Sequence, residues 1–382
     1  MRPMIYIRRQ AGNRLRSVTQ LQESVREGHP RVLWQEVIGE LEETIGAPPL
    51  LPSSMVPGRS PLQAEHANAD YTICHAAGRR VLQAALAHLL TGEERYRDAA
   101  LRQCEVLLDP RAWPEWRDQA HPSHEADLRT GMLASDLAIA YDWLHEGLTP
   151  TQRAWLVEGL DRRAIQPFWR SIESGPFWAE KPSNWMTCIV GGLGIAGMAL
   201  RDDHPDSDRL VEFSLPRMRN YLSVYGPEGE FNESVAYSNS TLSPVRYFLA
   251  YRCWSGGTEN VPAEWPFPQT CRWLMHMTLP PGRVAAFGDS HLDGPPAAAL
   301  FAAVAGAAGD RVLQWFYLNH LSTGREEPHF SLLWFDPTLA PQHPREQMPL
   351  GRAYTTQGQC MSSRSDWNPR ATHCVLYGKG GA

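Results

Sequence analysis

The stretch Lys181–Leu200, KPSNWMTCIVGGLGIAGMAL, decides the expected fold, because it joins a polar, aromatic entrance to an apolar helix. Apolar and small residues recur in it at spacings of three and four, which is typical of a helix. Each of its glycines would cost about 1 kcal/mol relative to alanine in an exposed helix, so they indicate that neighbouring helices approach closely. The apolar run is shorter than the roughly 20 residues that cross a bilayer. The stretch therefore predicts a buried central helix that is capped by Asn184. The N-terminus of this helix, which carries Trp185, is expected to face a cavity.

Composition excludes several classes of protein. The chain has 382 residues, which is enough for one large domain or two ordinary ones. Its 36 basic and 42 acidic side chains give a net charge of −6, and no basic block indicates a nucleic-acid partner. No membrane partner is expected either. The first residues hold no apolar run long enough for a signal peptide, which predicts a cytoplasmic protein, or a periplasmic or secreted one if a leader has been removed.

The cysteines and histidines indicate neither disulfides nor a metal centre. Seven cysteines are spread along the chain without a C-x-x-C pair, and most of them lie in apolar helical patterns. Free buried thiols are the expected state. The spacings of histidine and cysteine match no metal site, so we predict no metal ligand and no cofactor for these residues.

Helical periodicity continues through most of the chain. Tyr71–Leu90 carries an apolar face, and Thr91-Gly92 separates it from a second such segment, which predicts an antiparallel pair. Thr149 followed by Pro150 is a strong signal for the start of a helix. One long helix is expected from Ala297 to His320. About eleven paired helices favour an all-α closed array over a parallel sheet.

The end of the chain has a different pattern. Tyr354–Tyr377 loses the helical spacing and alternates polar, β-branched and aromatic residues, with Asn368-Pro369 as a turn. It predicts two or three strands, which are too few to bury a sheet face of their own. We therefore expect a helical domain over residues 1–350, and over residues 351–382 the start of a β-domain that is cut off.

A second stretch of chemical interest is YGPEGEFNESVAYSNS at residues 225–240. Its residues 228–237 place three glutamates and a tyrosine between two apolar helices. Glu230 and Glu233 could serve as the paired carboxylates of a glycoside hydrolase. A solvated loop would explain the glutamates equally well, but it has less need of Phe231 and Tyr237.

Four segments, in this order, resemble the helical domain of the heparinase II/III-like polysaccharide lyases, a group related to oligoalginate and other uronate lyases. They are AIAYDWLHEGLTPTQRAWL (138–156), Lys181–Leu200, GPEGEFNESVAY (226–237) and AAFGDSH (285–291). The segment SRSDWNPRATHCVLYGKGG (363–381) resembles the first strands of that family's β-sandwich. The resemblance implies an all-α fold, an (α/α) toroid or incomplete barrel, followed by a β-sandwich. It also implies a carbon–oxygen lyase that cleaves anionic, uronate-containing polysaccharides by β-elimination.

The resemblance also implies roles for individual residues. Asn184 matches the asparagine that neutralises the carboxylate of the uronate, and Tyr237 matches the tyrosine that acts as the acid, or as both acid and base. Further side chains expected to contact the substrate are His124, Glu125, Arg129, Trp185, Glu233 and Arg246.

The sequence departs from the family pattern in two places. Many relatives carry a histidine directly after the asparagine, where this chain has Trp185, so a histidine base at that position is not expected. Relatives also take a second catalytic histidine, and often a structural zinc, from the β-sandwich. This sequence holds only the first strands of that sandwich, so weak activity or none is expected from it alone.

Two alternatives to a lyase remain. One is a glycoside hydrolase on a similar helical toroid, and the other is a non-catalytic carbohydrate-binding protein. A lyase leaves a conjugated C4–C5 double bond that absorbs in the ultraviolet, whereas a hydrolase leaves a new reducing end without a chromophore. A binding protein leaves the glycan unchanged.

Overall fold

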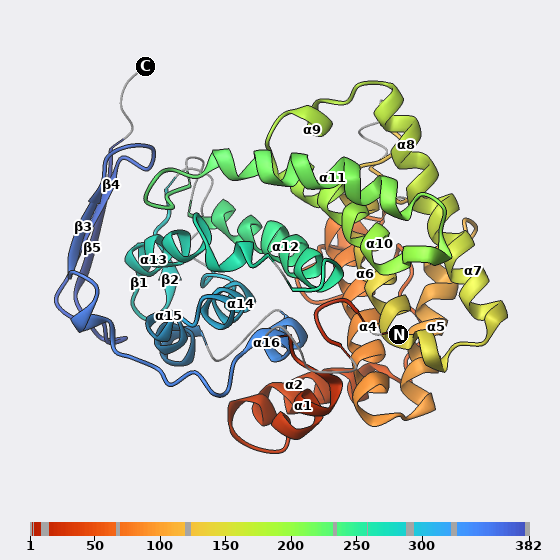
Figure 1. Cartoon of the computed structure of the whole chain (residues 1–382), viewed down its shortest axis with the longest axis horizontal. Helices are drawn as coiled ribbons and strands as arrows, with labels where there is room; N and C mark the ends of the chain where they lie inside the picture. The colour runs from red at the N-terminus through yellow and green to blue at the C-terminus, as the bar shows by residue number, and fades with distance from the viewer. Residues whose placement is uncertain are drawn as a thin grey trace. The chain divides into compact units, whose positions relative to one another are not determined.

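The computed structural model describes residues 2, 4–8, 15–65, 69–118, 124–231, 235–257, 259–287, 294–321 and 327–378. These ranges are mostly helical, as the periodicity predicts (Figure 1). The α-helices are α1 (Val18–Ser24), α2 (Gly28–Thr44), α3 (Pro61–Ala64), α4 (Tyr71–Thr91), α5 (Glu94–Leu108), α6 (Leu128–Leu144), α7 (Pro150–Leu160), α8 (Gln166–Glu173), α9 (Phe177–Glu180), α10 (Gly191–Leu200), α11 (Ser207–Tyr221), α12 (Leu242–Trp254), α13 (Phe267–Met277), α14 (Ala298–Ala308), α15 (Arg311–Phe316) and α16 (Pro328–Trp334). The strands are β1 (Thr278–Leu279), β2 (Arg283–Val284), β3 (Gly351–Tyr354), β4 (Cys360–Arg364) and β5 (His373–Tyr377). Among the helices in these ranges, none is long and apolar enough to cross a membrane.

The chain forms two compact units. The first comprises Met1–Arg26, Trp34–Tyr221 and Cys253–Gly257. The second comprises Glu27–Leu33, Leu222–Arg252 and Thr258–Ala382. The expected boundary between a helical domain and a β-domain at residue 350 stays a prediction.

The first unit is built around the predicted central helix. Its α10 packs against both α6 and α11, and α6 packs against α4 (Figure 1). A Cβ atom on Gly131 of α6 would lie only 2.1 Å from the carbonyl oxygen of Cys188, and one on Gly192 would lie 2.2 Å from the carbonyl oxygen of Gly131. No real Cβ comes that close to a backbone oxygen. Gly192 of the central stretch and Gly131 of α6 therefore allow a close helix–helix approach, as the sequence indicates.

Local signals set several helix ends where the sequence predicts them. Pro150 is the first residue of α7, and the side chain of Thr149 accepts a hydrogen bond from the backbone N–H of Gln152 (3.2 Å). The helices α4 and α5 pack against each other. Between them Gly92 takes a left-handed conformation (φ 75°) that ends α4. The expected helical pair is therefore present.

The single helix expected from Ala297 to His320 is wrong, because the chain breaks in the middle of that range. Gly309 adopts φ 65°, a left-handed conformation that ends α14. The next residue, Asp310, then caps α15, since its carboxylate accepts the backbone N–H groups of Val312 (3.0 Å) and Leu313 (3.1 Å). A Gly-Asp pair supplies one C-terminal and one N-terminal cap in succession, and this outweighs the continuous apolar pattern.

The second unit ends in the predicted strands. The strands β3, β4 and β5, drawn in dark blue in Figure 1, form one antiparallel sheet. Their order in the sheet is β3–β4–β5. The sheet is fastened to α13, since Ser362 Oγ lies 2.9 Å from His276 Nδ1. Arg364 of β4 also donates to the carbonyl oxygens of Thr278 (2.8 Å) and Met275 (3.3 Å).

A buried carboxylate joins the same sheet to a preceding turn. Glu230 is completely buried, and its side chain accepts the backbone N–H groups of Glu228 (2.9 Å) and Gln357 (3.2 Å). Gln357 lies in the connection between β3 and β4. Arg352 of β3 pairs with the carboxylate of Glu228. The Glu228–Glu230 turn and the sheet are therefore locked together by charge and by backbone hydrogen bonds.

Three histidines in the second unit are held neutral by their surroundings. Burial, assisted by the guanidinium of Arg364, lowers the pKa of His276 to about 3 and that of His373 to about 4. Burial also lowers the pKa of His320 to about 4, although a hydrogen bond to the Trp367 carbonyl opposes the shift. In the unfolded chain these groups titrate near pH 6.5.

These shifts predict that acid destabilises the second unit. Between about pH 6.5 and pH 4 the unfolded chain binds protons that the folded chain excludes, so the free energy of unfolding falls as the pH falls through this window. We expect the melting temperature to drop by at least several degrees from pH 7 to pH 5. His276→Gln should flatten the drop, whereas His343→Gln, at a more exposed site, should not. A melting temperature independent of pH in the wild type would contradict the assignment.

Candidate functional site

The residue that caps the central helix differs from the one expected. The backbone N–H of Met186 donates to Ser183 Oγ (3.4 Å), and that of Thr187 donates to the Ser183 carbonyl (3.3 Å). Ser183 is therefore the cap, and the expectation that Asn184 caps the helix is wrong. The serine lies one residue earlier, where its hydroxyl can reach the free N–H groups of the first turn. Asn184 falls inside that turn instead.

The side-chain amide of Asn184 is available for other interactions. The residue is half-buried, and its backbone carbonyl accepts the hydroxyl hydrogen of Thr187 (2.9 Å). Its side-chain amide makes no hydrogen bond to any residue within the described ranges. Directly after it the helix passes through a π-helical segment, η3 (Met186–Val190), before α10 begins. Such π-helical turns often occur at functional sites. The amide N–H groups thus lie at the positive end of a long helix, where an anion is stabilised.

Aromatic side chains gather beside Asn184. The half-buried ring of Trp185 lies 5.4 Å from that of Phe177 on α9, and Phe177 lies 6.3 Å from the ring of His124. Phe177 is itself exposed. We call His124, Phe177 and Trp185 the aromatic cluster. Exposed and half-buried rings of this kind offer flat apolar faces against which a sugar ring can pack.

His124 contributes to this cluster a ring nitrogen that is unpaired among the described residues. Its Nδ1 atom is buried and has no hydrogen-bond partner among the residues that the structure describes. Arg117 holds the segment in place by donating to the backbone carbonyl of His124 (3.1 Å). A ring nitrogen of histidine can donate or accept a hydrogen bond, so Nδ1 of His124 is a polar atom within the cluster that no described residue uses.

Two of the expected substrate contacts are occupied within the protein. Glu125 forms an exposed ion pair with Arg170 (2.6 Å). Arg129 donates to the Ala69 carbonyl (2.9 Å) and pairs with Asp127 (3.0 Å) and Asp118 (2.9 Å). These bonds use all three nitrogens of the guanidinium, so the geometry favours a role for Arg129 in holding the segment before α6.

The remaining predicted residues belong to the second unit. Tyr237 is half-buried in the short helix η6 (Ala236–Thr241), directly before α12. The guanidinium of Arg246 lies over the ring of Phe330, 4.4 Å from its centroid. Glu233 falls outside the described residues, as does the segment Asp289–His291 of the AAFGDSH motif. The expectation that Asn184 and Tyr237 meet in one pocket stays a prediction.

The structure bears directly on the paired-carboxylate alternative. Glu230 is completely buried, and both of its oxygens accept backbone N–H groups. A general acid or nucleophile has to reach the scissile bond of its substrate. The burial of Glu230 therefore weighs against a hydrolase that uses this residue.

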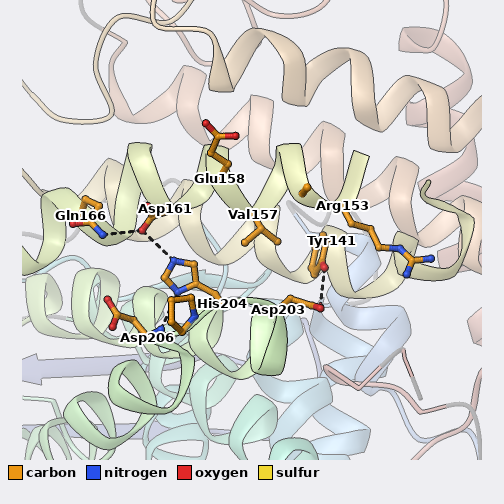
Figure 2. A pocket seen from close by; sticks show the side chains of 11 residues that line it. Tyr141, Arg153, Val157, Glu158, Asp161, Gln166, Asp203, His204 and Asp206 are labelled. Carbon is orange, nitrogen blue, oxygen red and sulfur yellow. Dashed lines mark hydrogen bonds and ion pairs between the residues drawn. The ribbon is translucent and has the colours of Figure 1, made fainter. Parts of the chain in front are cut away.

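A pocket that the sequence did not predict lies elsewhere in the first unit (Figure 2). It has a volume of about 630 Å³ and is formed by the end of α6, by α7 and η2 (Asp161–Ile165), and by the turn after α10. That turn, RDDHPD at residues 201–206, is a dense polar run directly after the apolar helix α10, and this run is the one sequence signal for the pocket. Since a helix rises about 1.5 Å per residue, this end lies roughly 25 Å from Asn184.

The walls of this pocket are held by hydrogen bonds. His204 Nδ1 accepts the backbone N–H of Asp206 (3.1 Å), so its proton is on Nε2, which donates to Asp161 Oδ1 (3.0 Å; Figure 2). At the other end, Tyr141 donates to Asp203 Oδ2 (2.8 Å), and Arg2 donates to the same oxygen (2.6 Å). The pocket is therefore preformed at both ends.

No protein-family model matches this chain, and no curated protein matches it either. Within the described ranges, no group of three or more histidine, cysteine, aspartate or glutamate side chains is arranged to hold a metal ion.

Proposed function

We propose that this protein is a polysaccharide lyase that cleaves uronate-containing glycans by β-elimination, with the chemistry of the heparinase II/III-like enzymes. The observation that carries the proposal is the half-buried amide of Asn184. It lies in the first turn of the central helix, it makes no side-chain hydrogen bond within the described ranges, and it adjoins the aromatic cluster. The (α/α) toroid and the first strands of a β-sandwich belong to the same proposal. The proposed architecture is supported by the packed helix pairs of the first unit and by the sheet β3–β4–β5.

The proposed reaction assigns a separate task to each group. A base removes the C5 proton of the uronate, the electron pair forms the C4–C5 double bond, and the C4–O bond breaks. Negative charge moves onto the uronate carboxylate on the way to the transition state. The amide N–H groups of Asn184, together with the helix N-terminus, stabilise that charge. Tyr237 gives its phenolic proton to the leaving oxygen, since a phenolic O–H group is a donor.

Tyr237→Phe is the direct test of this assignment. It removes the proton donor and keeps the ring, so turnover should fall by roughly 100-fold or more, while the affinity for glycan stays within about threefold. Turnover is measured as ultraviolet absorbance of the unsaturated product, in a screen of alginate, heparin, heparan sulfate, chondroitin and hyaluronan. Tyr377→Phe is the matched control, because this tyrosine is exposed on β5 and its change should leave turnover near the wild-type value.

The outcomes separate the lyase from its alternatives. New reducing ends without absorbance would indicate a hydrolase. Affinity for a glycan would indicate a binding protein if a longer chain with a complete β-sandwich also failed to cleave that glycan. Full activity of Tyr237→Phe on a substrate that the wild type cleaves would overturn the role of Tyr237.

A further inference from the structure

The pocket at the C-terminal end of α10 contains a cation, Arg153, that pairs with no carboxylate among the residues that the structure describes. Arg153 lines it from α7, and its buried Nε atom has no hydrogen-bond partner among the described residues (Figure 2). It also forms no ion pair with a described carboxylate. A guanidinium presents a planar set of donors that matches a carboxylate or phosphate group. Arg153 therefore offers an unused site for an oxyanion.

The charge of Arg153 acts on the Tyr141 end of the pocket. Burial lowers the pKa of His145, and the guanidiniums of Arg2 and Arg153 lower it further. The nearby carboxylate of Asp203 is already shared by Arg2 (2.6 Å) and the Tyr141 hydroxyl (2.8 Å). At this end of the pocket the guanidinium of Arg153 thus lies near a carboxylate whose charge Arg2 already balances, while Glu158, Asp161 and Asp206 line other parts of the pocket.

The rest of the pocket offers acceptors for hydroxyl groups. At each end one carboxylate oxygen is engaged and the other is not: Asp161 Oδ2 and Asp203 Oδ1 accept no hydrogen bond from a described residue. Val157 lines the middle of the pocket between them (Figure 2). Fixed carboxylate oxygens that flank an apolar surface suit a small molecule with several hydroxyl groups. The volume of about 630 Å³ lies in the range of small-molecule sites.

We propose that this pocket binds a sugar acid, with its carboxylate on Arg153 and its hydroxyl groups on Asp161 and Asp203. The inference depends on the chemistry of the pocket and is independent of the proposed lyase reaction. The predicted reaction centre lies roughly 25 Å away along the helix, so Asn184→Ala should leave binding here unchanged. The site is thus a second sugar site in the first unit.

The test measures binding of D-glucuronate to the full chain by isothermal titration calorimetry. Arg153→Gln should weaken binding about tenfold or more, since it removes the charge and keeps a polar side chain. Val157→Phe should abolish binding by filling the pocket. Arg162→Gln is the matched control. It lies on the adjacent segment, lines a different pocket and should change affinity less than about twofold.

Comparison ligands decide the chemical class. Glucose lacks the carboxylate and should bind at least about tenfold more weakly than glucuronate. Equal affinity for glucose, tighter binding of glucosamine, no detectable binding of glucuronate, or unchanged affinity in Arg153→Gln would each overturn the proposal. Melting temperatures of all variants near the wild-type value would show that they are folded.

Discussion

Asn184→Ala is expected to lower the kcat of uronate elimination by about 100-fold or more and to leave KM within about threefold of the wild-type value. The amide lies in the first turn of the helix and makes no side-chain hydrogen bond within the described ranges. Its loss therefore removes a donor without breaking an internal contact. The donor is needed most when charge builds on the uronate carboxylate, so the transition state loses more than the bound substrate does.

Ser183→Ala is the matched control for this prediction. It removes the hydroxyl that caps the same helix (3.4 Å to the N–H of Met186) and should lower the free energy of unfolding by about 1 kcal/mol. It should leave kcat close to the wild-type value. Asn184→Gln, which keeps the amide on a longer side chain, should restore part of the activity. Two results would contradict the role of Asn184 as a charge-stabilising donor. One is that Asn184→Ala keeps at least a third of wild-type turnover, and the other is that Ser183→Ala loses as much turnover as Asn184→Ala.

Gly131→Ala is expected to lower the free energy of unfolding by about 3 kcal/mol or more. The added methyl group would lie 2.1 Å from the carbonyl oxygen of Cys188 and 2.7 Å from the Cα of Ile189. Both obstacles are backbone atoms of a buried helix, so no side-chain rotation relieves the clash, and α6 and the central helix have to separate. Urea denaturation measures this change in the free energy of unfolding, at the transition in which the first unit unfolds.

Gly39→Ala makes the same chemical change where there is room. Gly39 lies in α2, is exposed, and has no atom within 4 Å of the position of a Cβ. Alanine there should raise the free energy of unfolding by roughly 0.5 to 1 kcal/mol, because it favours the helix over the unfolded chain. Equal effects of the two substitutions would mean that α6 and the central helix are not in close contact.

The parts of the fold that sequence alone predicts are those set by neighbouring residues. The Thr149-Pro150 start of α7, the close-packed glycines of the central helix and the strands after residue 350 each follow from a short pattern. The break at Gly309 was missed because an alanine-rich apolar run continues across it. There two adjacent caps outweigh the periodicity.

The candidate site was predictable only where residues lie close together in the chain. Asn184 and Trp185 are neighbours, and their helix was foreseen, although the capping residue was misplaced by one position. The pocket at the other end of that helix combines residues from three separate segments, near positions 141, 153–166 and 203–206. No spacing rule joins such segments. Likewise, nothing in the run around Glu230 shows that its carboxylate turns inward to meet the backbone of Gln357.

The fastening of Glu230 and α13 to the terminal sheet matters for anyone who wishes to trim this scaffold. A cut after residue 350 would strip Glu230 of a backbone donor, leave His276 without its serine, and take the guanidinium of Arg364 away from the carbonyl oxygen of Thr278. The cut would expose buried polar atoms and the apolar surface around them to water, and exposed apolar surface promotes aggregation. A shortened fragment that is meant to stay monodisperse therefore has to keep the sheet β3–β4–β5. If the second unit is fused to another protein, its helices and this sheet should be transferred together.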